Sequence, residues 1–134
     1  MASSSGAGDI KVYVRELEDR ISNDTSLPQY IKDYRYAQLH QAQGYFLDSL
    51  HCLEKAIIGV RPFKSNFIWS GSFVSIASLL ASNYDYVGRF DEAEALYSEL
   101  VLCDPDGDHI CDFAVFLQKR RKDFNHSQMY VFEN

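Results

Sequence analysis

The chain has 134 residues, of which 46% are apolar and 14% aromatic, enough for one domain with a continuous core rather than a disordered segment. Its 13 basic and 19 acidic residues give a formal net charge of −6, which disfavours nucleic acid or an anionic membrane surface as the main partner. No uninterrupted apolar run approaches the roughly 18 residues that a membrane helix needs. We therefore expect a cytoplasmic protein, with the nucleus as the alternative compartment.

The beginning of the chain predicts a tail followed by one amphipathic helix. Residues 1–8 are rich in Ser, Gly and Ala, lack the features of a secretory signal, and are expected to be disordered. Residues 9–29 are interpreted as an N-terminal capping helix and a linker. Apolar residues recur at helical spacing after Asp9, a candidate N-cap: Ile10, Val14, Leu17 and Ile21.

A second helix is predicted from about Pro28, which suits a first helical turn, to Gln43. Beyond it the sequence repeats itself. The residues that follow Gly44 lie at the offsets found after Gly88: Phe46, Ser49, Leu53 and Ala56 correspond to Phe90, Ala93, Tyr97 and Leu100. Two copies of one helix-turn-helix unit, displaced by 44 residues, are therefore expected.

A stretch of extra residues separates these two copies. Relative to a period of about 34 residues, ten are left over, and they fall in residues 64–73. This insert contains Phe67, Ile68 and the single tryptophan, Trp69. Because it is apolar, we expect it either to lengthen the flanking helices or to pack back over the repeats.

A third copy is predicted from Asp108, because a further step of about 34 residues carries Phe90 onto Phe124. Its first helix should run to Lys122, with four apolar residues on one face: Ile110, Phe113, Ala114 and Leu117. Its second helix should begin near Phe124 and continue to Asn134. No alternating strand pattern flanked by hairpin turns competes with these helices.

The most complete copy, Val74 to Gly107, carries a recognisable pattern of small, aromatic and turn residues. Small residues are expected to let paired helices approach closely, here and in the first copy: Gly44, Ser49, Ala56, Ala81, Gly88 and Ala93. Aromatic residues are expected to fill the space beside them: Tyr84, Phe90 and Tyr97. Leu80 belongs to the same pattern, and Pro105 ends the second helix of the unit.

This pattern resembles the tetratricopeptide repeat family over residues 30–134, with units at about 30–63, 74–107 and 108–134. The chain departs from the family at Ala77, where Trp is favoured, at Leu100, where Ala is favoured, and at Lys122, which replaces the glycine between the helices. The resemblance implies an all-α fold, a right-handed superhelix of antiparallel helix pairs with about seven helices. It also implies a scaffold that binds proteins, with no catalysis and no cofactor.

In the family, the first helix of each unit lines a concave groove. The resemblance therefore places a partner-binding wall at Tyr34, Gln38, Gln41, Ser78, Ser82, Asp85, Asp112 and Lys119. The wall is mostly neutral and able to hydrogen-bond, so it suits an extended peptide or a helix of a partner protein better than an anionic tail. The alternative is that these are ordinary solvent-exposed residues with no binding role.

Other assignments remain open at the level of the sequence. The chain is alternatively a regulatory or targeting subunit of a larger enzyme complex, or a fragment of a longer repeat array. The last predicted helix is apolar and could mediate self-association through Phe124, Met129, Tyr130, Val131 and Phe132.

Three candidate motifs give little support for calcium binding, a basic signal or catalysis. Asp104, Asp106 and Asp108 resemble the start of a calcium loop, but His109 and Val115 occupy positions where that loop needs Gly and Glu. The basic run 119–122 is either an import or phosphate signal or, more simply, a set of cations at a helix C-terminus. The four histidines share no helical face with a carboxylate, which argues against an enzyme.

The three cysteines are irregularly spaced, which excludes a disulfide framework and a paired-cysteine zinc site. We expect them to be small, buried apolar residues in a reducing compartment: Cys52, Cys103 and Cys111.

Overall fold

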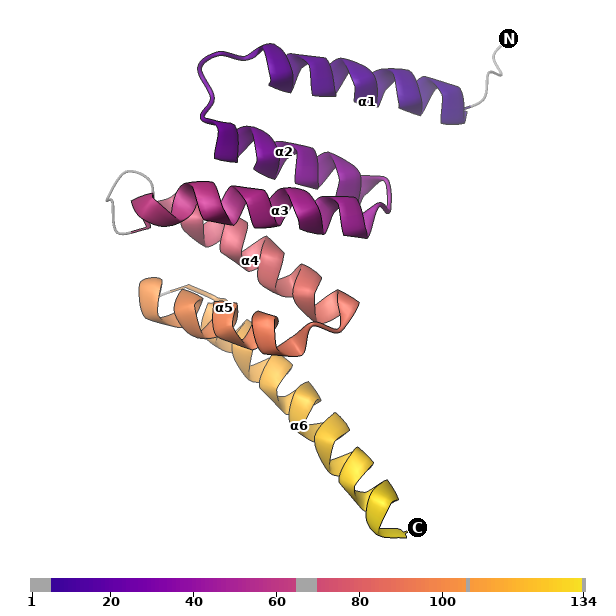
Figure 1. Ribbon diagram of the computed structural model, residues 1–134, viewed down its shortest axis with the longest axis vertical. Helices are drawn as coiled ribbons and strands as arrows, with labels where there is room; N and C mark the ends of the chain where they lie inside the picture. The colour runs from indigo at the N-terminus through magenta and orange to yellow at the C-terminus, as the bar shows by residue number, and fades with distance from the viewer. Residues whose placement is uncertain (1–5, 65–69, 106, 134) are drawn as a thin grey trace. The chain divides into compact units, whose positions relative to one another are not determined.

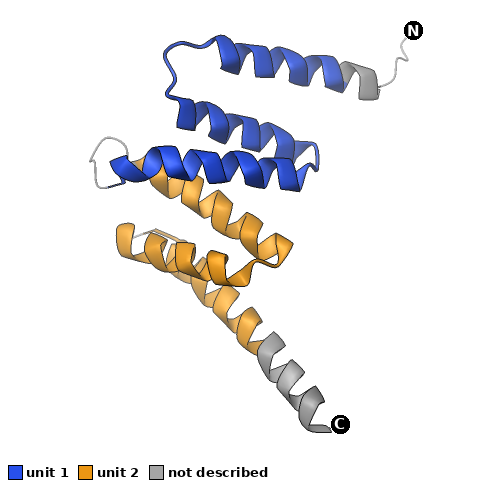
Figure 2. Ribbon diagram, viewed as in Figure 1, with its two compact units in different colours: residues 1–65 blue, residues 66–134 orange. Residues whose placement is uncertain are grey.

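The computed structural model describes residues 6–64, 70–105 and 107–133, and the side chains of 10–64, 71–105 and 107–122. These residues form six α-helices and one short 3-10 helix, and no strand occurs among them (Figure 1). The predicted all-α class is confirmed. The chain divides into two compact units, residues 1–65 and residues 66–134 (Figure 2). The division falls inside the stretch 64–73 that the repeat spacing marks as extra.

Unit 1 contains α1 (Gly6–Asn23), α2 (Gln29–Ala42), α3 (Phe46–Val60) and the 3-10 helix η1 (Arg61–Phe63). Helix α1 begins three residues before Asp9, so the predicted N-cap at Asp9 is wrong. Pro28, in extended conformation, is the N-cap of α2. Helices α2 and α3 form a tight hairpin: a Cβ added to Gly59 would lie 3.0 Å from the Cβ of Tyr30.

Helix α1 packs beside α2 with less burial than the hairpin has. Its apolar side chains Val14, Leu17 and Ile21 are half-buried, and Ile10 is 60% exposed. Polar contacts tie the C-terminal end of α1 to α2: Lys32 Nζ donates to the Ser22 carbonyl over 3.0 Å, and the Ser22 and Tyr36 hydroxyls are hydrogen-bonded. The fully buried residues of unit 1 lie on α2 and α3, including Ala37, Leu53, Ala56 and Val60.

Unit 2 contains α4 (Ser70–Val87), α5 (Phe90–Cys103) and α6 (His109–Glu133), with α5 packed against both α4 and α6. Aromatic rings fill the α5–α6 interface. The ring centroid of Tyr97 lies 5.9 Å from that of Phe113, in a stacked arrangement, and 5.2 Å from that of Phe116. Phe90 contacts Phe116 from the other side, at 6.4 Å. Residues 65–69, with the predicted apolar insert's Phe67, Ile68 and Trp69, lie outside the described residues.

The turns after α2 and α4 have the same geometry, 44 residues apart. Gly44 and Gly88 have φ of 84° and 87°, the left-handed region that glycine adopts without steric cost. The residue after each glycine donates its N–H to the carbonyl of the residue five positions earlier: Tyr45 to His40 over 2.9 Å, and Arg89 to Tyr84 over 2.8 Å. This is the Schellman pattern that closes a helix. The predicted 44-residue displacement is confirmed.

The small residues of the repeat have two distinct roles. Ser49, Ala56, Ala81 and Ala93 are fully buried, as close helix packing requires. A Cβ added to either turn glycine, in contrast, would meet no atom within 4 Å. The two glycines are therefore needed for their backbone conformation and not for close approach of the helices.

The third copy differs from its prediction. Helix α6 runs without a break from His109 to Glu133, so the predicted turn at Lys122 and the separate helix from Phe124 are wrong. The reason is local. Lys122 occupies the position that Gly44 and Gly88 hold in the other copies, and a lysine in the left-handed region costs about 1–2 kcal/mol. Without a glycine the helix continues.

Candidate functional site

The eight residues of the predicted binding wall lie on three helices. Tyr34, Gln38 and Gln41 belong to α2 in unit 1; Ser78, Ser82 and Asp85 to α4, and Asp112 and Lys119 to α6, all in unit 2. The α2 and α4 residues correspond pairwise at the 44-residue displacement. Because both turns have one geometry, each pair occupies the same position in its hairpin.

In unit 1, the structure places the three α2 residues in unlike surroundings. Tyr34 and Gln41 are half-buried, whereas Gln38 is exposed and lines a pocket between α1 and α2. Gln38 therefore borders the contact between α1 and α2 while its side chain remains exposed. Sequence reasoning assigned α1 only a capping role.

In unit 2, the structure brings three of the five predicted residues together. Lys119 Nζ lies 3.7 Å from Asp85 Oδ1, and this oxygen is buried without a hydrogen-bond partner. Burial raises the pKa of Tyr97, and the negative charges of Asp85 and Asp112 raise it further. The two carboxylates thus lie near the Tyr97 hydroxyl. We call Asp85, Asp112 and Lys119, together with the Tyr97 hydroxyl on which the two carboxylates act, the Tyr97 cluster.

The two serines of the wall lie on α4, the helix that also carries Asp85. Ser78 is half-buried, and Ser82 is exposed with its hydroxyl directed to the Leu79 carbonyl of its own helix at 3.4 Å. Such a bond leaves the Ser82 side chain accessible along α4. Because Ser82 is exposed, its side chain can be enlarged without displacing a buried one.

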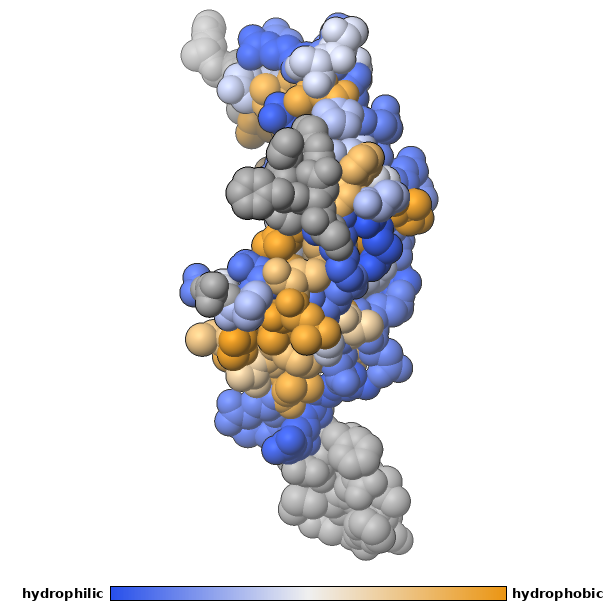
Figure 3. All heavy atoms as spheres, turned by 90° about the vertical axis from the view of Figure 1, so that its left-hand side faces the viewer, coloured by the Kyte–Doolittle hydropathy of each residue, from blue (hydrophilic) through white to orange (hydrophobic). Residues whose placement is uncertain are grey.

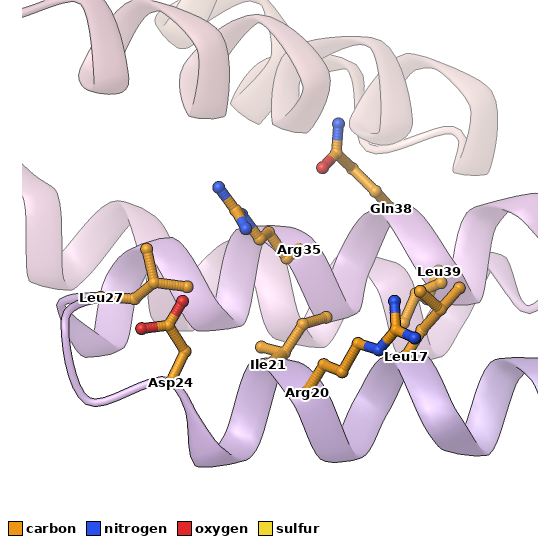
Figure 4. A pocket seen from close by; sticks show the side chains of 8 residues that line it. All are labelled: Leu17, Arg20, Ile21, Asp24, Leu27, Arg35, Gln38 and Leu39. Carbon is orange, nitrogen blue, oxygen red and sulfur yellow. The ribbon is translucent and has the colours of Figure 1, made fainter.

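The pocket in unit 1 has a volume of about 390 Å³ (Figure 4). Residues of α1, the α1–α2 loop and α2 line it: Leu17, Arg20, Ile21, Asp24, Leu27, Arg35, Gln38 and Leu39. Asp24 and Leu27 lie at the loop end, and Leu17 and Leu39 lie together at the other, near Arg20. Of these residues, only Gln38 was predicted to bind a partner; the rest become neighbours only through the packing of α1 on α2.

The basic run 119–122 lies in the middle of α6 and not at a helix C-terminus, so that explanation of it is wrong. Arg120 reaches across to α5, where Nη1 donates to Glu94 Oε1 over 2.6 Å and the guanidinium also pairs with Asp91. Lys119 pairs with Asp85 of α4. Two of the four cations therefore join α6 to its neighbours within unit 2.

The structure also bears on the three cysteines and on the acidic turn after α5. Cys103 and Cys111 are exposed and Cys52 is half-buried, so the prediction of three buried cysteines is wrong; burial raises the pKa of the Cys52 thiol. At the turn after α5, His109 Nε2 lies 3.1 Å from Asp104 Oδ2. Within the described part of the chain, no group of three or more His, Cys, Asp or Glu side chains could hold a metal ion.

No protein-family model, no curated protein and no solved structure matches this chain. Among the helices in the described ranges, none combines the length and the apolar character needed to cross a membrane.

Proposed function

We propose that this chain is a helical-repeat interaction module, similar to tetratricopeptide repeats, that binds a peptide or helix of a partner protein. The observation that carries the proposal is the recurrence of one hairpin, with the same glycine conformation and hydrogen bonds, in α2–α3 and α4–α5. Proteins that repeat a helix pair in this way present extended surfaces and use them for binding. The proposed role is non-catalytic and cytoplasmic.

Exposed apolar side chains support a protein partner. On the face drawn in Figure 3, apolar residues gather over part of unit 2. On the helices that carry the predicted wall, Tyr86 of α4 is 70% exposed, and Ile110 and Val115 of α6 are 50% and 66% exposed. Contiguous exposed apolar surface commonly marks a site of protein interaction.

The proposal places the partner against the first helix of each hairpin, along Tyr34 in unit 1 and Ser82 in unit 2. A large charged side chain introduced there should obstruct the partner. Ser82→Arg is the test variant because Ser82 is exposed on α4. Ala95→Arg is the matched control, since Ala95 is also exposed but belongs to α5, the second helix of the same hairpin.

The experiment is affinity capture followed by calorimetric titration of the purified partner. We expect Ser82→Arg, alone or with Tyr34→Ala, to weaken binding at least about tenfold, the loss of roughly one good interfacial contact. Ala95→Arg should bind like the unmodified chain. A partner that binds Ser82→Arg and Tyr34→Ala at full affinity would show that the first helices are not the binding surface.

A further inference from the structure

We propose that the pocket between α1 and α2 binds an apolar side chain of a partner peptide together with an adjacent Asp or Glu, whose carboxylate pairs with Arg20. The inference rests on the proposed function and names the chemistry of the segment that unit 1 recognises. The pocket volume of about 390 Å³ lies within the range that is typical of small-molecule binding pockets, so one side chain of a peptide fits into it.

The apolar part of this specificity comes from the pocket lining. Four of its eight residues are aliphatic: Leu17, Ile21, Leu27 and Leu39. Each of the four is only half-buried in the structure. An aliphatic or aromatic side chain seated among them would remove apolar surface from water on both partners, at roughly 25 cal/mol per Å².

The charged part comes from two arginines with unequal surroundings. Neither Arg20 nor Arg35 forms a hydrogen bond or a close ion pair with any described residue. Arg35, with Lys32, lies close enough to Asp24 to help lower the pKa of that carboxyl, behind the two hydrogen bonds that Asp24 accepts from Ser26. Asp24 therefore offsets part of the charge of Arg35. Arg20, toward the other end of the pocket, is the cation left for a ligand (Figure 4).

The balance of charges favours a monoanion. The lining carries two guanidinium groups and one carboxylate, a net charge of +1. Residues 1–65 contain eight basic and eight acidic residues, so unit 1 as a whole does not oppose that local charge. A carboxylate matches the geometry of one guanidinium, and its single negative charge balances the net charge of +1 of the lining. An acidic residue next to an apolar one has both required features.

The test uses the full chain, labelled with ¹⁵N, and two capped peptides: acetyl-Gly-Leu-Glu-Leu-Gly-amide and the same peptide with Gln in place of Glu. We expect the Glu peptide to shift the amide resonances of Leu17, Ile21 and Leu39, and to bind about tenfold more tightly than the Gln peptide, as a charge-assisted hydrogen bond would give. Inorganic phosphate serves as the third probe and should not shift these resonances.

Arg20→Gln should reduce the affinity for the Glu peptide to that for the Gln peptide, and Arg20→Lys should retain part of it. Arg15→Gln is the matched control, because Arg15 is exposed on α1 and does not line the pocket. Equal binding of both peptides, equal binding to Arg20→Gln and the unmodified chain, shifts outside the pocket, or phosphate binding there would each overturn the inference. A partner lost on Ser82→Arg but retained by Arg20→Gln would overturn this inference alone and leave the proposed function standing.

Discussion

Tyr97 is the residue at which the packing and the predicted binding wall of unit 2 meet. Its ring stacks on Phe113 and contacts Phe116, while its hydroxyl lies near the carboxylates of Asp85 and Asp112. The sequence identified Tyr97 as a packing residue of the repeat and the two aspartates as members of the predicted binding wall. It could not show that one side chain joins them, because α6 approaches α5 and α4 only in the folded unit.

The raised pKa of Tyr97 predicts a loss of stability at alkaline pH. Burial and neighbouring negative charge favour the protonated phenol in the folded state, so its folded pKa lies above the unfolded value of about 10. Its contribution to stability is complete below that pH and is lost as the pH rises through the folded pKa. We expect Tyr97→Phe to show a shallower fall in stability above pH 10 than the unmodified chain, measured by urea unfolding at a series of pH values.

Tyr13→Phe is the control, because Tyr13 is 63% exposed on α1. It should leave the alkaline fall unchanged. Identical slopes for Tyr97→Phe and the unmodified chain would mean that the folded unit does not perturb this phenol.

Single-residue exposure was the least predictable property. Cys103 was expected to be buried because free cysteines usually are. It is exposed because it is the last residue of α5, where the chain leaves the helix. The sequence pattern did not distinguish Arg20 from the other charged residues of its helix. Its place in a pocket depends on how α1 packs on α2, and helical periodicity within α1 does not contain that information.

At the level of elements, the boundaries set by glycine and proline were predictable and the others were not. The start of α2 after Pro28, the end of α5 before Pro105, and both glycine turns follow from local backbone rules. The error at Lys122 arose because the repeat spacing was extended over a position that lacks the required glycine. The local rule was the better guide there.

This account of the turns predicts opposite effects for two glycine substitutions in unit 2. Gly88→Ala forces a Cβ into the left-handed region and should lower the free energy of unfolding by about 1–2 kcal/mol. Gly71→Ala, in the first turn of α4 with no atom within 4 Å of the added Cβ, should leave it unchanged or raise it by up to about 0.5 kcal/mol. Thermal and urea unfolding followed by circular dichroism measure both. Equal destabilisation by the two substitutions would contradict the role assigned to Gly88.

For the molecule as a whole, the all-α class followed from composition and periodicity, whereas the division into two units did not follow from a single repeat domain over 30–134. The repeat spacing indicated where the units divide, because the ten residues in excess of the repeat period fall at 64–73, and the boundary between the units lies within this stretch. Charge divides in the same place: residues 66–134 contain five basic and eleven acidic residues, so the whole net charge of −6 belongs to unit 2. The two units therefore offer a partner different electrostatic surfaces.

The central claim is that a partner protein binds against the first helix of each hairpin. Hydroxyl-radical footprinting of the full chain, free and with its captured partner, tests it most directly. We predict that the partner protects Tyr34 on α2 and the α4 segment around Ser82 from oxidation, while Leu47, Ile58 and Leu102, exposed on α3 and α5, remain equally reactive. Protection of Leu47, Ile58 and Leu102 with Tyr34 unchanged would place the partner on the second helices and contradict the account.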